Sequence, residues 1–139
     1  MNTQYWLVGA MWGGQDDALS MFLKRGYWYC WDKNWNIDSV TDKGNSIKNQ
    51  QERFKKIKIN DRIAVKRLLG KGKSEMSILA LGIVKDVDIE EWRIYVDWII
   101  EKIENRKVPV RGCLSSIHGP YFLGENKDDD DWIRQIFCL

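Results

Sequence analysis

The clearest pattern of hydrophobic and polar positions along the chain repeats every two residues between positions 92 and 98. Trp92, Ile94, Val96 and Trp98 alternate there with Arg93, Tyr95 and Asp97. This alternation predicts a β-strand with one buried face, because successive side chains of a strand point to opposite sides. We therefore expect Trp92 and Trp98 to be core residues, together with Trp6 in an earlier apolar run.

Shorter apolar runs predict the remaining strands. They cover residues 5–10, 27–31, 63–69, 76–84 and 108–110. The segment Gly70–Lys73 between two of these runs is typical of a β-hairpin turn. Gly82 inside a run predicts a bulge, and Pro109 confines its strand to a sheet edge because proline lacks the backbone N–H.

Helical patterns occupy three segments. Asp16 is the expected N-cap of a first helix that ends at Gly26, and Ser46 is the expected N-cap of a second helix. The second helix is expected to run through Ile57, and a third covers residues 128–139, where four aspartates favour the positive end of the helix dipole. The order of elements predicts an α+β fold with about six strands, about three helices and a curled, mostly antiparallel sheet.

Length and composition indicate one domain. The 139 residues are 44% hydrophobic, so we expect a single core and a single domain over residues 1–139. No apolar run is long enough to cross a bilayer, and the N-terminus lacks the basic start and cleavage site of a secretory signal. We therefore expect a cytoplasmic protein with no membrane partner. Three cysteines without a Cys-x-x-Cys pair predict reduced, mostly buried thiols.

Few residues suggest catalysis or metal binding. His118 is the only histidine, and we expect it in a turn without other metal ligands around it. The acidic run 128–131 lacks the spacing and the glycine of a calcium loop. Gly72-Lys73-Ser74 lacks the preceding glycine of a phosphate-binding loop, since Arg67 stands there, and Cys30 has no neighbouring histidine to activate it. We therefore predict a protein that is not an enzyme and holds no metal or cofactor.

Positive charge is concentrated between Arg53 and Lys73. This segment holds nine basic residues and one acidic residue, Asp61, which amounts to about +8 in a chain with a net charge of +2. Such a segment predicts a phosphate-facing edge, and a solvated helix face with a charged hairpin tip is the open alternative. The expected phosphate-binding residues are Lys55, Lys56, Arg62, Lys66, Arg67, Lys71 and Lys73.

Tryptophan is unusually frequent for a chain of this length. Five of the eight tryptophans lie at positions 6, 12, 28, 31 and 35, in the first quarter of the chain. Large aromatics fill the core of a small domain, and they also stack on planar ligands such as bases. We expect both uses here. Residues 32–45 are rich in Asp, Asn, Gly and Lys and predict a long loop, where ligand-binding residues often lie.

Four segments of the chain resemble a known family. They are residues 5–17 (YWLVGAMWGGQDD), 22–28 (FLKRGYW), 54–66 (FKKIKINDRIAVK) and 80–84 (ALGIV). In this order they resemble the EVE-like N-terminal domains of McrB-type restriction proteins and, more distantly, the EVE and YTH domains of the PUA-like superfamily. The similarity spans most of Tyr5 to Trp98. The chain departs from the pattern at Asn60, where relatives tend to carry glycine, and in the long 32–45 loop.

The resemblance implies a pseudo-barrel that binds nucleic acid, DNA in preference to RNA, and holds a flipped, methylated base in an aromatic cage. The implied cage residues are Met11, Trp12, Trp28, Trp31, Asp32 and Trp35. Trp28 matches the cage tryptophan that follows the first helix in this superfamily, at the mouth of the pocket. Met11 and Trp12 match the segment after the first strand that lines the same pocket. The carboxylate of Asp32 is expected to accept a hydrogen bond from a base amino group.

The resemblance also implies partners. In McrB-type systems such a domain is joined to a GTP-driven motor that recruits a nuclease, so we expect a monomeric recognition module with these attached or associated partners. Two other functions stay open. One is an RNA-binding PUA-like or ASCH-type module, and the other is a protein-interaction domain whose exposed aromatics bind a partner chain. Nucleic-acid binding differs from the last in its steep dependence on salt.

Overall fold

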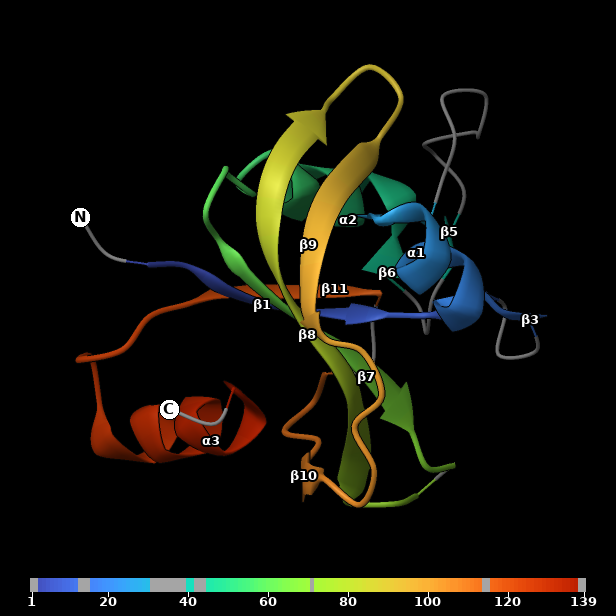
Figure 1. Ribbon diagram of the computed structural model, residues 1–139. Coiled ribbons are helices and arrows are strands. Elements are labelled where there is room, and N and C mark those ends of the chain that lie inside the picture. Colours follow the sequence, from blue (N-terminus) through green and yellow to red (C-terminus); the bar gives the residue numbers. More distant parts are fainter. Residues whose placement is uncertain are drawn as a thin grey trace.

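The protein has the predicted α+β fold, and its main sheet is mixed (Figure 1). The computed structural model describes residues 3–12, 16–30, 40–41, 45–70, 72–113 and 116–137. Within these ranges it holds three helices and a main sheet of seven strands. The strand pairings leave this sheet open between its two outer strands.

The main sheet combines strands from both ends of the chain. Its order is β11 (Ile117–Tyr121), β1 (Tyr5–Gly9), β7 (Arg62–Leu68), β8 (Glu75–Asp88), β9 (Arg93–Ile100) and β4 (Tyr27–Trp28), and β10 (Lys107–Pro109) pairs with β8 beside this path. The pair β1–β7 is parallel and the other pairs are antiparallel. Two short hairpins complete the strands: β2 (Met11–Trp12) with β3 (Asp16–Asp17), and β5 (Val40–Thr41) with β6 (Asn45–Ser46).

The helices agree with the sequence patterns at most of their ends. They are α1 (Leu19–Arg25), α2 (Ile47–Phe54) and α3 (Lys127–Phe137). Helix α1 ends as predicted at Gly26, which adopts a left-handed φ of 72° and donates its N–H to the Phe22 carbonyl oxygen. The predicted N-cap of α1 is wrong, because Asp16 is paired in β3 and Ala18 precedes the helix without a side-chain cap. Helix α2 stops at Phe54, before the predicted Ile57.

Gly82 marks the predicted bulge. The register between β8 and β9 shifts between Leu81 and Gly82. A Cβ atom at Gly82 would overlap the Val96 side chain and lie 2.9 Å from the Asp97 carbonyl oxygen. Only glycine therefore lets the two strands approach this closely.

Two hydrophobic cores lie on opposite faces of the sheet. Along β1, Trp6 points into the first core and Leu7 into the second. Phe22 of α1 and Phe54 of α2 fill the first core, whereas Trp132 of α3 belongs to the second. Figure 1 accordingly shows α3 apart from the other two helices. The central strands are therefore covered on both faces, which explains their continuous apolar sequence.

The predicted core tryptophans are located as expected, to different degrees. Trp6 is fully buried, and its indole N–H donates a 2.9 Å hydrogen bond to the Asp61 carboxylate. Trp92 and Trp98 are half-buried and pack against the first core. The Trp98 indole N–H donates to the Phe22 carbonyl oxygen at 2.9 Å, which ties β9 to α1.

Strand β11 is absent from the sequence-based prediction. His118 lies within it, opposite Leu7 of β1, so the predicted turn position of this histidine is wrong. Helix α2 fastens this outer strand: the Gln50 side-chain oxygen accepts a hydrogen bond from the Ile117 N–H, and Arg53 donates to the Ile117 carbonyl oxygen at 2.8 Å. Side chains that satisfy an edge strand in this way protect it from pairing with other chains.

Among the residues that the structure describes, no helix is long and apolar enough to span a membrane. Cys30 and Cys113 are buried thiols outside any disulfide, as predicted. The Cys113 sulfur lies 3.4 Å from the Tyr121 hydroxyl oxygen, and burial raises the pKa of the Cys113 thiol. This thiol is therefore held in its neutral form, which is a poor nucleophile.

Candidate nucleic-acid interface

Trp28 lies in the core and not at the mouth of a pocket. Its side chain is 0% exposed and its ring packs beside Phe22, with ring centroids 6.4 Å apart. Its indole N–H donates a 2.8 Å hydrogen bond to the Gly9 carbonyl oxygen. A buried indole N–H needs an acceptor, and the end of β1 supplies one. The predicted placement of Trp28 at a pocket mouth is therefore wrong in this conformation, and its ring presents no open face to a base.

The Trp28–Gly9 hydrogen bond brings two distant segments together. Ala10 follows Gly9, and Cys30 lies two residues after Trp28. Both belong to the same core, where they are 1% and 8% exposed. The backbone of Met11 and Trp12 continues from Ala10 into the β2–β3 hairpin. The other cage candidates, Trp31, Asp32 and Trp35, follow Cys30 and lie outside the described residues. Both predicted cage segments therefore begin at one end of the sheet.

A cluster of two tyrosines and an arginine lies at β4, where the second of these segments begins. We call Tyr27, Tyr29 and Arg93 the Arg93 cluster. The guanidinium carbon of Arg93 lies 4.8 Å from the ring centre of Tyr27 and 4.7 Å from that of Tyr29. The two tyrosine rings meet edge to face, with centroids 5.6 Å apart. Distances of this size are typical of cation–π contacts, so the rings hold the guanidinium in place.

Sequence analysis missed the Arg93 cluster, although a signal was present. Arg93 occupies the polar phase of the period-two pattern in β9, and Tyr27 and Tyr29 alternate with the buried Trp28. These phases place all three side chains away from Trp28, on the same side of the β4–β9 pair. The pattern did not indicate that β4 pairs with β9, and this pairing brings the tyrosine rings to the guanidinium.

The side chain of Arg93 makes no ion pair or hydrogen bond with the described residues. Its Nε atom is buried without a hydrogen-bond partner. Asp88 lies opposite Arg93 in the register of β8 and β9, but one oxygen of its carboxylate accepts the N–H groups of Glu90 and Glu91 in the hairpin turn, each at 3.1 Å. The rings of the cluster therefore hold a guanidinium that no carboxylate of the described residues neutralises at contact distance.

The predicted phosphate-facing edge is divided in the structure. Lys66 is 4% exposed on β7 beside Gly9, so its predicted contact with phosphate is wrong. Charge alone marked this residue as a surface group, whereas its place on a covered central strand buries it. Lys55 and Lys56 are exposed after α2, and Lys73 is exposed in the turn between β7 and β8. The length of β7 separates these two groups by about 20 Å.

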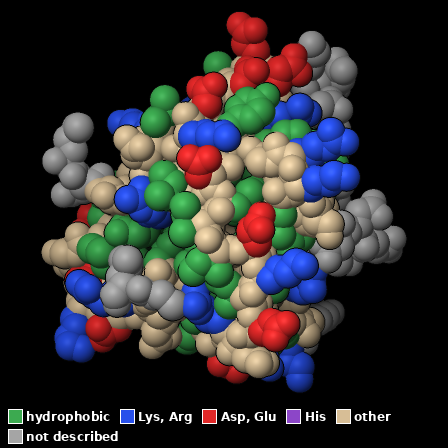
Figure 2. Space-filling view, viewed as in Figure 1, with side chains coloured by type: hydrophobic (Ala, Val, Ile, Leu, Met, Phe, Trp, Pro, Cys, Tyr) green, Lys and Arg blue, Asp and Glu red, His purple; other side chains and the backbone are tan. Residues whose placement is uncertain are grey.

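The remaining predicted phosphate contacts have other surroundings. Arg62 and Arg67 are half-buried on β7, and Arg62 donates a 2.6 Å hydrogen bond to the Asn60 carbonyl oxygen. Lys55 forms an ion pair of 3.2 Å with Glu52 on the same helix. Lys71 lies outside the described residues. On the face in Figure 2, basic and acidic side chains alternate, and acidic ones gather over the tip of the β8–β9 hairpin.

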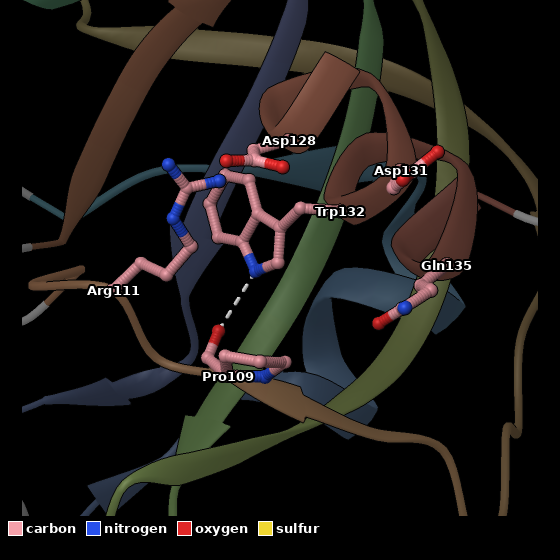
Figure 3. Close-up of a pocket in the computed structure, with 6 residues that line it drawn as sticks. All are labelled: Pro109, Arg111, Asp128, Asp131, Trp132 and Gln135. Atoms are coloured by element: carbon pink, nitrogen blue, oxygen red, sulfur yellow. Dashed lines mark hydrogen bonds between the residues drawn. The ribbon is translucent and has the colours of Figure 1, made fainter.

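A groove of about 300 Å³ lies between β10 and α3 (Figure 3). Its lining residues are Pro109, Arg111, Asp128, Asp131, Trp132 and Gln135. The guanidinium of Arg111 lies 4.8 Å from the Trp132 ring centre and pairs with Asp129 at 2.6 Å, which lowers the pKa of that carboxyl. The Trp132 indole N–H donates to the Pro109 carbonyl oxygen at 2.8 Å. These polar groups bond to one another, and their contacts attach α3 to β10.

The chain matches no family model, and no curated protein is significantly similar to it in sequence. The resemblance to EVE-like domains therefore stays a prediction. The function is inferred from the residues that the fold brings together at the ends of β1 and β4.

Proposed function

We propose that this chain is a non-catalytic nucleic-acid-binding module that captures one base, most favourably a methylated DNA base, in an aromatic pocket. The observation that carries the proposal is the hydrogen bond between Trp28 and Gly9, because it makes two tryptophan-bearing segments begin side by side. Trp12 lies in one segment, and Trp31 and Trp35 lie in the other. In this proposal Trp28 lies in the core and supports the pocket from the inner side.

The energies of base capture are consistent with such a pocket. Extrusion of a base from a duplex costs a few kcal/mol, and stacking on one aromatic side chain returns about 1–3 kcal/mol. Two tryptophans therefore suffice to hold the base. A methyl group adds about 0.8 kcal/mol when a closed cage buries it. Greater selectivity requires a hydrogen bond to the base edge, which is the role proposed for Asp32.

The proposal extends to the fold and to the partners. We propose that the curled sheet corresponds to an EVE-like, PUA-like pseudo-barrel. The module then serves as the recognition part of a cytoplasmic restriction or defence system, with a GTP-driven motor and a nuclease attached or associated. Lys55, Lys56 and Lys73 supply attraction to phosphates that does not depend on sequence.

A binding screen tests the proposal. Fluorescence anisotropy is measured with labelled DNA oligonucleotides, single-stranded and duplex, that carry cytosine, 5-methylcytosine, adenine or N6-methyladenine at one position, and with matched RNA. We expect DNA binding with a preference for one methylated base. Trp12→Ala and Trp31→Ala should remove the preference and leave the weaker unspecific binding. Trp92→Ala is the control, since this half-buried indole packs against Phe54 in the core.

Each alternative function gives a different result in the screen. Equal or tighter binding of the matched RNA would favour an RNA-binding module. Absence of any salt-dependent binding to DNA or RNA would overturn the proposal and favour a protein-interaction domain.

A further inference from the structure

Arg93 is a cation that the fold positions without a counter-ion among the described residues. Its guanidinium packs against Tyr27 and Tyr29, both half-buried, and both rings also meet the Phe22 ring in the core. The position of the guanidinium is therefore set by the β4–β9 pair and α1. Within the described part of the chain, the Nε–H of Arg93 is buried without an acceptor, which is unfavourable. Because Nε is buried, a ligand would meet the terminal N–H groups of the guanidinium, which are not buried in this way.

The chemistry of a stacked guanidinium favours an oxyanion as its ligand. A guanidinium is planar and presents parallel N–H groups that match two oxygens of a phosphate or carboxylate. Stacking on aromatic rings leaves the edge of the plane available and reduces the conformational entropy lost on binding.

The location of the cluster points to a phosphate of nucleic acid. Tyr29 is two residues before Trp31, so the cluster lies at the root of the segment that carries the proposed cage. Lys24 and Arg25 are exposed in the last turn of α1, directly before Gly26 and β4. These cations precede β4 in the chain and attract a polyanion toward this strand.

We propose that the Arg93 cluster is a phosphate-binding subsite, which holds one phosphodiester next to the captured base. This inference rests on the proposed function. Arg93 contacts the phosphate oxygens, and the tyrosine rings keep its guanidinium oriented. Asp88, across the strand pair, and the acidic tip of the β8–β9 hairpin repel further phosphates, so the strand turns away from the tip after this contact.

The test compares Arg93→Gln with Arg111→Gln. Both substitutions remove one guanidinium that stacks on an aromatic ring, but Arg111 already pairs with a carboxylate. The probe is a fluorescein-labelled, unmodified single-stranded DNA 15-mer, and anisotropy is measured between about 50 and 200 mM NaCl. We expect Arg93→Gln to weaken binding about tenfold and to reduce the slope of log K against log salt by about 0.7, the value for one contact to single-stranded nucleic acid. Arg111→Gln should change neither quantity.

Two further variants refine the test. Arg93→Lys keeps the charge but not the planar fork, so it should lose affinity while it retains most of the salt slope. Asp88→Asn removes a negative charge and keeps the oxygen that accepts the turn N–H groups, so it should tighten binding severalfold. Circular dichroism of each variant checks that the fold is intact.

The outcomes separate this inference from the proposed function. If the unaltered protein binds no oligonucleotide, both are overturned. If it binds and Arg93→Gln binds as tightly with the same salt slope, only the subsite is wrong. If Arg93→Gln does not fold, the subsite is tested by titrating the unaltered protein with inorganic phosphate and following its ¹⁵N NMR signals. The Arg93 Nε–H signal should then shift on titration while that of Arg111 stays in place, and an unmoved Arg93 signal would refute the subsite.

Discussion

The indole N–H of Trp28 donates a buried hydrogen bond of 2.8 Å to the carbonyl oxygen of Gly9. This single bond joins the last residue of β1 to β4, whose partner in the main sheet, among the described strands, is β9. It also satisfies a polar group that would be costly to bury alone. The fold therefore uses Trp28 as a structural link, and the segments on either side of the link carry the other aromatics.

Substitution of Trp28 should reduce the stability of the fold before it affects any preference for a base. Trp28→Phe keeps most of the ring but leaves the Gly9 carbonyl without its donor, so we expect a loss of about 1–3 kcal/mol in the free energy of unfolding. Trp28→Ala also creates a cavity and should cost about 3–5 kcal/mol. Urea denaturation monitored by circular dichroism measures both changes. A stable Trp28→Ala protein that loses only its preference for a methylated base would restore Trp28 as a cage wall.

Asp61 should stabilise the fold, because three hydrogen-bond donors converge on its carboxylate. One oxygen of its carboxylate accepts hydrogen bonds from the Gln4 amide, the Trp6 indole and the Lys58 backbone N–H, at 2.8, 2.9 and 2.8 Å. Asp61→Ala leaves these donors without an acceptor, and we expect a loss of about 2–4 kcal/mol in the free energy of unfolding. Asp97→Ala is the matched control, since this exposed carboxylate only pairs with Lys85 at 3.4 Å. It should cost less than about 1 kcal/mol in the same urea titration.

Gly82→Ala should destabilise the bulge between β8 and β9. The added Cβ overlaps Val96 and crowds the Asp97 carbonyl oxygen, so we expect a loss of about 1–3 kcal/mol in the free energy of unfolding. Gly9→Ala is the control, because an added Cβ there has its nearest neighbours at 3.9 Å. Its effect should stay within about 0.5 kcal/mol. Equal melting temperatures for the two variants would contradict the tight approach of the strands at Gly82.

Stability should fall in weak acid because of His118. Burial lowers the pKa of His118 from 6.5 to about 4, and the nearby positive charges of Arg53 and Lys66 add to this shift. Between these two values the unfolded chain binds a proton that the folded chain does not, so the free energy of unfolding decreases as pH falls from about 6.5 to about 4. Urea titrations at several pH values should show a shallower decrease for His118→Gln. Identical pH profiles would show that His118 is not protected from protonation.

The sequence by itself determined those features that depend on local order. The period-two pattern located β9, Gly70–Lys73 placed a hairpin turn, and Gly26 ended α1, because each of these relies on neighbouring residues and on backbone preferences. Gly82 marked its bulge for the same reason. In the candidate site, local order grouped the tryptophans into two segments but did not say which rings are buried.

Only the tertiary structure decided which segments meet. Strand β11 has little strand pattern of its own, and it forms because β1 pairs with it while α2 satisfies its outer edge. Lys66 is buried because β7 lies between β1 and β8, although its charge suggested a surface position. The Arg93 cluster exists because β4 pairs with β9 across more than sixty residues of chain. Periodicity shows that one face of a strand is buried, but the partner that buries it depends on contacts between residues far apart in sequence.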